Sequence, residues 1–529
     1  MLVRFAFSTL GLFAVMSASA HARAADVPTG LPTDLPAYID QVRTTFNVPG
    51  IAVAVIKDGK VVFEQGSGLR NVALHLPVDV HTKFCIASNT KSVTATAIEI
   101  LAERGKLHMD DRVTDHLPWF RMAEPYATRE MRVRDLLAHR SGLGSHAGDL
   151  LFLPSTRYNT REVVEHLAYL PLSTGFRENF AYENIMFAVA TLVVEQASGQ
   201  SYADFVRTQI FAPVGMGDAL IDGSELRPTD DVATSYMPDA GGRLGPVPTL
   251  VWENNAGAAG IYASIHDMAR WAGTQLSQGA LPPPNGAQSR LFSAATQADM
   301  FTMVTPIPIE APSVPALAPA QPNSFGYAAG WFVSDFRGEH MVWHTGGFPG
   351  TVSETTLFPS LGLAVVVLTN QESEEAFNAI TFHVADSYLG RSDTDWIAGF
   401  AASAKKRAKR LEADDAKNER RPEPLVPPAL PLARYAGRYK DAWYGVVDVT
   451  TDGNKLRVSF SDSSRLMGTA EPWRGDSFRI RWDDRTLHAD AFIDFVPDGH
   501  GGISRATMRR ASARTAPAYD FQDLDLHRQ

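Results

Sequence analysis

The sequence predicts an α+β protein, in which a mixed sheet flanked by helices, with an inserted helical region, precedes a smaller all-β domain. At 529 residues the chain is too long for one ordinary domain. Between residues 30 and 395, strand-like runs lie at both ends and helical patterns lie between them. This order fits one sheet whose terminal strands meet. A charged and Pro-rich stretch follows, and after it the chain changes to short strands broken by turns.

The first residues have the pattern of a secretory signal peptide. A cationic start with Arg4 precedes an apolar run, Phe5 to Met16, that is too short to span a bilayer. Small residues ending at Ala20 or Ala24 then offer a cleavage site. We expect residues 1–24 to be removed, which places the mature chain in the periplasm or outside the cell, without a stable membrane span. An uncleaved anchor is the alternative.

The charge balance and the residue types limit the partners and cofactors. The chain has 49 basic and 59 acidic residues, and this net charge of −10 argues against nucleic acid or an anionic membrane surface as the main partner. Cys85 is the one cysteine in the sequence, so no internal disulfide can form, and we expect a small buried core residue there. The sequence has no H-E-x-x-H pattern, Cys/His cluster or phosphate-binding glycine loop, so neither a metal nor another cofactor is expected.

Hydrophobic periodicity gives the elements of the first part in chain order. Helices are predicted over residues 35–46, 94–104, 161–170, 185–198 and 267–276. Strands are predicted over residues 51–56, 60–65, 341–344, 352–358 and 364–369. The first two strands flank Asp58-Gly59, which is a hairpin signal. The Pro/Ala-rich segment 306–322 is predicted to be an extended surface loop.

A linker is predicted between the two domains. Charged residues dominate from 403 to 421, where acids follow a basic run, and Pro422 to Pro431 closes the segment. A solvated linker helix explains this pattern, and a membrane-binding basic helix is the alternative. We therefore assign residues 396–431 to the linker and residues 432–515 to the all-β domain. Strands of that domain are predicted over residues 445–449, 455–460, 478–482, 489–495 and 504–509.

Three short motifs carry the predicted chemistry, and the first is S-x-x-K at Ser88 and Lys91. It follows an apolar strand-like run and opens a helix, so the i,i+3 spacing places both side chains on one helix face. A serine hydroxyl is a poor nucleophile until a base removes its proton, and a lysine can do so if burial lowers its pKa. The motif alone is weak, because Ser403 and Lys406 in the charged linker share its spacing.

The second motif is Y-x-N at Tyr182 and Asn184, and the third is H-T-G-G from His344 to Gly347, at the end of an apolar strand. Near the serine, Tyr182 could relay a proton to the leaving group, and Asn184 could hydrogen-bond a substrate amide. Glycines at a strand end let a substrate lie against the strand edge, where a backbone N–H could stabilise an oxyanion. The alternative for the second motif is an ordinary residue pair that enters a helix.

In this order and in these settings, the three motifs resemble those of the penicillin-recognising serine hydrolases. That superfamily includes class C β-lactamases, DD-peptidases, D-aminopeptidases and related esterases. Further similar stretches lie at residues 133–143, 259–264 and 326–331, and the resemblance covers about residues 30–390. The all-β domain is similar in texture to the lipocalin-like C-terminal domain of S12-type serine peptidases, which implies a small antiparallel β-barrel.

The resemblance implies that Ser88 is the acylated nucleophile, Lys91 its base or proton relay, and Tyr182 the acid/base partner of the leaving group. His344 stands at the catalytic position of the third motif, where β-lactamases of this type usually have lysine. Neutral histidine lacks the permanent charge that grips a β-lactam carboxylate, so antibiotic hydrolysis is disfavoured. His139 is expected to be a packed structural histidine near the site.

Substrate binding is implied for Asn184, Gly346 and Gly347, with the Ser88 and Gly347 backbone N–H groups forming the oxyanion hole. Three functions stay open. The first is a peptidase or amidase that acts on short peptides, including those with D-residues or unusual linkages. The second is a carboxylesterase, and the third is a penicillin-binding or sensing protein with little turnover. A small peptide or ester is thus the expected partner, and the appended β domain is compatible with a homo-oligomer.

Overall fold

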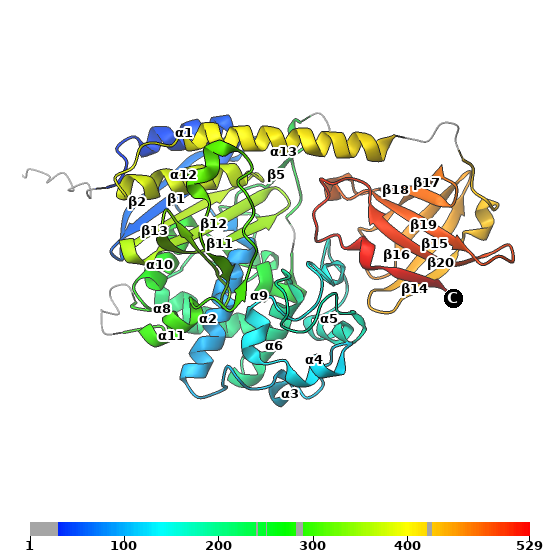
Figure 1. The fold of residues 1–529 in the computed structure, drawn as a ribbon, viewed down its shortest axis with the longest axis horizontal. Coiled ribbons are helices and arrows are strands. Elements are labelled where there is room, and N and C mark those ends of the chain that lie inside the picture. The colour runs from blue at the N-terminus through cyan, green and yellow to red at the C-terminus, as the bar shows by residue number, and fades with distance from the viewer. Residues whose placement is uncertain (1–29, 240–241, 250, 282–288, 421–425) are drawn as a thin grey trace, which may run out of the picture.

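The computed structural model describes residues 30–239, 242–249, 251–281, 289–420 and 426–529. The predicted leader, residues 1–24, lies outside the described residues. A large sheet with helices on both faces forms the first part of the chain, and a β-barrel forms the last part (Figure 1). The predicted fold class, an α+β architecture with a helix-flanked sheet and a small antiparallel barrel, is confirmed.

The terminal strands of the first part meet near the middle of a nine-stranded sheet, as the sequence predicts, where β1 pairs with β13. In spatial order the strands are β3 (Leu76–Pro77), β2 (Lys60–Asn71), β1 (Gly50–Lys57), β13 (Leu363–Thr369), β12 (Thr351–Phe358), β11 (Glu339–Phe348), β10 (Phe332–Phe336), β9 (Phe325–Tyr327) and β8 (Thr305–Pro306). All neighbours are antiparallel, which corrects the predicted mixed sheet. Short connections make β1 and β2, and the successive strands from β9 to β13, antiparallel, and β1 meets β13 antiparallel although the two lie far apart in the chain.

Each face of this sheet is covered by helices, because successive strand side chains point to opposite faces. Ile51 and Val53 of β1 pack in the core formed with α1 (Leu35–Thr45) and α12 (Glu374–Tyr388). Ala52 and Ala54 belong instead to the larger core on the other face. There α10 (Ile265–Leu276) packs on β1 and β13, and α2 (Thr90–Glu103) and α6 (Ile185–Ser198) belong to the same core.

The helical region lies on the α2 side of the sheet (Figure 1). Its remaining helices are α3 (Val113–His116), α4 (Pro125–Glu130), α5 (Thr160–Glu165), α7 (Tyr202–Val206), α8 (Ala212–Val214), α9 (Ala256–Ala259) and α11 (Ala294–Met300). The helix predicted over 185–198 is α6, with Gly199 left-handed at its C-terminus. The helix predicted over 161–170 divides into α5 and a 3₁₀ turn, His166–Tyr169. Pro171 disfavours helical backbone at the residue before it, which explains the early end.

Two short strand pairs complete the first part: β4 (Phe84–Cys85) with β7 (Tyr262–Ala263), and β5 (Tyr236–Pro238) with β6 (Leu244–Pro246). Cys85 in β4 is a buried free cysteine.

The predicted linker begins as part of the core. Helix α13 (Trp396–Glu419) runs along the α1 and α12 side of the sheet towards the barrel (Figure 1). Its first turns bury Trp396, Ile397 and Phe400, so the predicted boundary at 396 is too early. The predicted surface loop 306–322 contains a 3₁₀ turn, Pro315–Ala320, whose Leu317 packs with this core. Trp396, Ile397 and Phe400 lie on one face of the first turns of α13, and this apolar face packs in the same core as Leu317.

The C-terminal part is a closed eight-stranded barrel. Its strands are β14 (Gly437–Asp441), β15 (Gly445–Asp452), β16 (Lys455–Phe460), β17 (Met467–Arg474), β18 (Ser477–Trp482), β19 (Ala491–Pro497), β20 (Ile503–Arg510) and β21 (Asp525–Arg528). The predicted domain ends at residue 515, but β21 closes the barrel by pairing with β14 and β20, so the domain reaches Arg528. In the described chain no helix is both long and apolar enough to cross a membrane.

Candidate active site

Ser88 stands on a tight turn between β4 and α2. The 3₁₀ turn Ala87–Asn89 leads directly into the helix, and Ala87 has a left-handed backbone with φ 45°. Such a conformation costs about 1–3 kcal/mol for a residue with a side chain, and it persists only where the surroundings fix it. Here Asn89 Nδ2 donates to Ser353 Oγ at 2.8 Å, and that hydroxyl donates to the Ile86 carbonyl at 2.7 Å. The turn is therefore tied to β12 with Ser88 half-buried at its apex.

Lys91 is fully buried and lies one helical turn after Ser88. Its Nζ donates to Ser88 Oγ at 2.9 Å, to Asn184 Oδ1 at 2.7 Å and to the Ala258 carbonyl at 3.0 Å. Burial lowers the pKa of Lys91 to about 7, and the charge of Asp149 partly opposes that change. A pKa near 7 leaves part of the population neutral at neutral pH. Neutral Lys91 has two N–H groups, which can stay on Asn184 and Ala258, so its lone pair faces Ser88 Oγ and can accept the serine proton.

Asn184 connects Lys91 to a buried carboxylate. Its Oδ1 accepts from Lys91, and its Nδ2 donates to Asp149 Oδ2 at 2.9 Å. The same carboxylate oxygen accepts from His146 Nδ1 at 2.9 Å. Both ends of the Asn184 amide are therefore engaged within the protein, and its contact with a substrate amide stays a prediction.

Tyr182 lies on the other side of Lys91, with its ring centroid 4.9 Å from Nζ. Burial raises the pKa of Tyr182, and a side-chain hydrogen bond with Ser88 partly opposes this effect. The phenol accordingly keeps its proton at neutral pH and touches the hydroxyl that it is predicted to serve. The sequence motifs at 88–91 and 182–184 thus meet around one serine.

His344 is fully buried in β11 and is neutral. Its Nδ1 contacts the Thr345 carbonyl at 2.6 Å and must therefore carry the hydrogen, so Nε2 accepts from the Tyr327 hydroxyl at 2.8 Å. Burial lowers the pKa of His344 to about 3, and the positive charge of Lys91 adds to that effect. Its ring lies 6.3 Å from the Tyr182 ring, centroid to centroid. Both ring nitrogens have partners inside the protein, so this histidine supports the site, and its predicted catalytic role stays a prediction.

The two glycines of the third motif have different surroundings. A Cβ on Gly346 would lie 2.0 Å from the Ile86 carbonyl oxygen, so only glycine lets β11 approach the serine turn this closely. A Cβ on Gly347 would meet nothing within 4 Å, and this residue is exposed. The pairing of β10 with β11 ends at Trp343, so within the described residues the next stretch of β11 has no strand partner on that edge.

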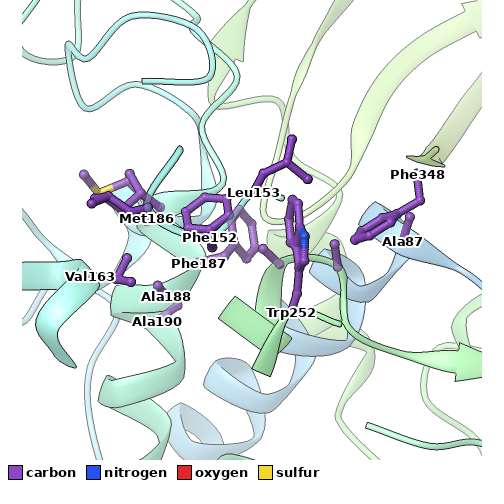
Figure 2. Packing of buried hydrophobic residues seen from close by; sticks show 14 of the residues in the cluster. Ala87, Phe152, Leu153, Val163, Met186, Phe187, Ala188, Ala190, Trp252 and Phe348 are labelled. Carbon is purple, nitrogen blue, oxygen red and sulfur yellow. The ribbon is translucent and has the colours of Figure 1, made fainter. Parts of the chain in front are cut away.

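Three aromatic rings form an apolar wall beside the turn that carries Ser88. Phe348 follows the glycines, and its ring lies 4.7 Å from that of Trp252, which in turn lies 5.0 Å from that of Phe152. Figure 2 shows Phe348 next to Ala87 at one end of this row and Phe152 at the other. All three side chains are buried, so this row supports the serine turn from the core.

Four residues near the site were not predicted to be functional, and they gave weak signals in the sequence. Asp149 is a lone acid in an apolar run, Tyr327 an aromatic in a Gly-rich stretch, and Glu183 the middle residue of the second motif. His139 is buried, and its Nδ1 accepts from the Glu183 backbone N–H at 3.1 Å, which fits the predicted structural role. The described residues hold no cluster of His, Cys, Asp or Glu placed to bind a metal ion.

Comparison with known proteins gives two family matches. The family described as Beta-lactamase matches residues 35–389, which is more than half of the chain. A domain of unknown function, DUF3471, matches residues 421–528.

The chain is also similar to individual proteins over most of its length. It is 27% identical over 466 residues to the unguisins hydrolase ungD' of Aspergillus campestris, covering 82% of this chain and 81% of that protein. The octameric penicillin-binding protein homologue from Pyrococcus abyssi has the same fold, with a TM-score of 0.58, 21% identity, and coverage of 93% of this chain and 99% of that one. EstCE1, described as a hydrolase with promiscuous acyltransferase activity, matches with a TM-score of 0.55 and 19% identity, covering 68% of this chain and 99% of its own.

Proposed function

Because the chain belongs to the Beta-lactamase family and is a serine hydrolase, we propose that it cleaves peptide or amide bonds of short peptides through an acyl-enzyme on Ser88. Peptides with D-residues or unusual linkages are included. The observation that carries this proposal is the buried Lys91, whose Nζ lies 2.9 Å from Ser88 Oγ. The relative in Aspergillus campestris, named as a hydrolase of unguisins, supports hydrolysis without fixing the substrate of this chain.

In the proposed mechanism, neutral Lys91 accepts the Ser88 proton as Oγ bonds to the substrate carbonyl carbon. The backbone N–H groups of Ser88 and Gly347 stabilise the negative charge on the carbonyl oxygen. Tyr182 gives its proton to the leaving nitrogen as the C–N bond breaks, and it is reprotonated through Lys91. Water then attacks the acyl-enzyme, releases the carboxylic acid and restores the Ser88 hydroxyl.

The open edge of β11 favours a peptide as the substrate. Beyond Trp343 the strand has no β10 partner, and an extended peptide can add its backbone hydrogen bonds to such an edge. Neutral His344 offers no charge for the carboxylate of a β-lactam, so β-lactams are expected to be poor substrates.

A carboxylesterase is the second candidate, because the pair of Ser88 and Lys91 can also open an ester. Esters carry a better leaving group than amides and need less help from Tyr182. We further propose that the protein works in the periplasm or outside the cell, which rests on the leader-like residues 1–24 alone. A homo-oligomer stays a proposal that light scattering of the purified protein would test.

A substrate panel tests the proposed function. Wild type and a Ser88→Ala variant are assayed with linear L-peptides, D-residue peptides, cyclic peptides, small acyl esters and a chromogenic cephalosporin. The proposal predicts the highest kcat/KM for a peptide and none for the variant. Faster turnover of esters than of every peptide would favour the esterase, and stable acylation by the cephalosporin without turnover would favour the sensing protein. Activity that survives in the variant contradicts both hydrolase proposals.

A further inference from the structure

One buried carboxylate of the barrel reaches into the helix-flanked part of the chain. Asp520 lies between β20 and β21 and is 0% exposed. Its Oδ2 accepts from the Gly148 backbone N–H at 2.7 Å, and its Oδ1 accepts from the Leu150 backbone N–H at 3.0 Å. Both oxygens of Asp520 thus accept hydrogen bonds from one turn, and the two donors lie 372 and 370 positions earlier in the sequence.

The turn that Asp520 holds carries Asp149 at its centre. Gly148 has a left-handed backbone with φ 84°, and the 3₁₀ turn Asp149–Leu151 starts directly after it. A carboxylate bonded to the N–H groups on both sides of Asp149 fixes the position of that residue's Cα and the direction of its side chain. From there two hydrogen bonds lead to the candidate base, because Asp149 Oδ2 accepts from Asn184 and Asn184 Oδ1 accepts from Lys91.

Burial of this carboxylate is unfavourable and is not needed to attach the barrel. Burial and the nearby charge of Asp149 raise the pKa of Asp520 well above its usual range, and the two backbone N–H groups only partly oppose this. Other contacts already join the two parts, including the ion pair of Arg157 with Asp462 and the hydrogen bond from Tyr158 Oη to the Tyr444 carbonyl at 2.8 Å. Asp520 is costly to bury and is linked by hydrogen bonds to the reactive centre. Such a group indicates that local stability is given up for function.

We propose that Asp520 is a positioning residue that holds Asp149 and Asn184 in place and thereby orients Lys91 towards Ser88. The barrel then contributes to the active site, because Asp520 acts on Ser88 through Asp149, Asn184 and Lys91. This inference rests on the proposed function, because it assumes that Lys91 is the base for Ser88.

The test compares two barrel carboxylates that bind the same loop of the hydrolase part. Asp520→Ala removes the contact with the turn at Asp149, and Asp462→Asn weakens the contact with Arg157, which leads to no catalytic group. Full-length variants are labelled at Ser88 with a fluorophosphonate, and the second-order rate constant is measured against pH. Melting temperature shows whether each variant is folded. A misplacement of about 1 Å can slow a reaction about 10²-fold, and we expect a loss of that order for Asp520→Ala and none for Asp462→Asn.

The pH dependence separates positioning from simple stability. Besides Asp149 and its partner His146, the titratable groups around Lys91 are Tyr182, His139 and His344. Burial keeps Tyr182 protonated by raising its pKa and keeps His139 and His344 neutral by lowering theirs. The acid limb of the labelling rate therefore reports Lys91 together with the pair of Asp149 and His146 that faces it. In Asp520→Ala, Asn184 and Asp149 are no longer held in place, so the Lys91 ammonium loses a hydrogen-bond acceptor and part of the attraction of the Asp149 charge. Its pKa should fall, and the acid limb should move to lower pH.

Asp149→Asn provides a second variant if Asp520→Ala fails to fold. It leaves the barrel contact in place, weakens the link to Asn184 and should reproduce both the slow labelling and the shifted acid limb. The inference is overturned if folded Asp520→Ala, or Asp149→Asn in its place, labels at the wild-type rate with the wild-type pH profile. Equal labelling of wild type and a Lys91→Met variant would instead contradict the proposed function, whatever Asp520 does.

Discussion

The surroundings of Lys91 and the interior of the barrel hold different kinds of side chain. Around Lys91 the interior holds hydrogen-bonded polar groups, with Asn184 and Asp149 almost or fully inaccessible to solvent. The barrel interior is filled instead by aromatic rings, and those of Phe478 and Tyr435 lie 5.0 Å apart. The first arrangement is costly but changes the pKa of a lysine, and the second stabilises the fold without placing a reactive group.

This difference indicates where each part can be altered without loss of function. Substitutions around Lys91 should change rates more than stability, and substitutions inside the barrel should change stability more than rates. Asp520 joins the two, because it is a buried carboxylate of the barrel that bonds to the turn carrying Asp149.

The largest expected effect is the loss of the nucleophile or of its base. Ser88→Ala and Lys91→Met should each lower kcat/KM about 10⁴-fold or more, and the double variant should be no worse than either, because the two residues act as a unit. Ser403→Ala is the matched control, since it shares the motif spacing but lies on α13, where its hydroxyl bonds to Ser313. Control activity that falls as far as that of Ser88→Ala would contradict the assignment.

Removing the Tyr182 hydroxyl should have the next largest effect. Tyr182→Phe keeps the ring beside Lys91 but deletes the proton donor, so peptide turnover should fall by about 10²- to 10⁴-fold. The fall should be smaller for an ester with a good leaving group. Steady-state rates with matched amide and ester substrates measure the difference, and equal losses on both would speak against leaving-group protonation.

A barrel substitution should show the opposite behaviour. Phe478→Ala deletes a fully buried ring and should lower the free energy of unfolding of the protein by about 3–5 kcal/mol. Fluorophosphonate labelling of the folded variant should stay at the wild-type rate. Thermal unfolding and the labelling rate, measured on the same variant, check both statements. A large loss of labelling without a loss of stability would show that this barrel residue serves the reaction and not the fold.

An exposed ion pair of the barrel should matter least. Lys455 Nζ lies 2.6 Å from Glu471 Oε1, and both side chains are nearly half exposed. Solvent screens such pairs, so Lys455→Gln should change the free energy of unfolding by about 0–1 kcal/mol. Chemical denaturation of the two proteins is sufficient to measure this, and a change of several kcal/mol would show that the barrel surface is more cooperative than expected.

Local patterns in the sequence predicted much of the fold. Helix α6 was predictable because apolar residues dominate 185–194 and Gly199 follows its last turn, and the meeting of β1 with β13 followed from strands at both ends of the domain. Of the barrel strands, β14, β17 and β21 were missed. Gly468 and Pro472 interrupt β17, and polar residues dominate the short β14 and β21. Their pairing comes from barrel closure, which is a property of the whole domain.

The site divides in the same way. Ser88 and Lys91 share one helical turn, so their spacing alone placed them together. Asp149 lies 35 positions before its partner Asn184, and Asp520 lies 372 positions after Gly148. No local pattern encodes contacts of that range, and a single acid in an apolar run is as compatible with a turn as with a catalytic support.

The rate of fluorophosphonate labelling at Ser88 as a function of pH tests the central claim most directly. Only neutral Lys91 can accept the serine proton, and its pKa is about 7, so the rate should fall as the pH drops below that value. Lys91→Arg should label negligibly across the same range, because arginine does not lose its proton in proteins. A wild-type rate that stays constant through this range, or an arginine variant that labels normally, would show that Ser88 is activated by another group.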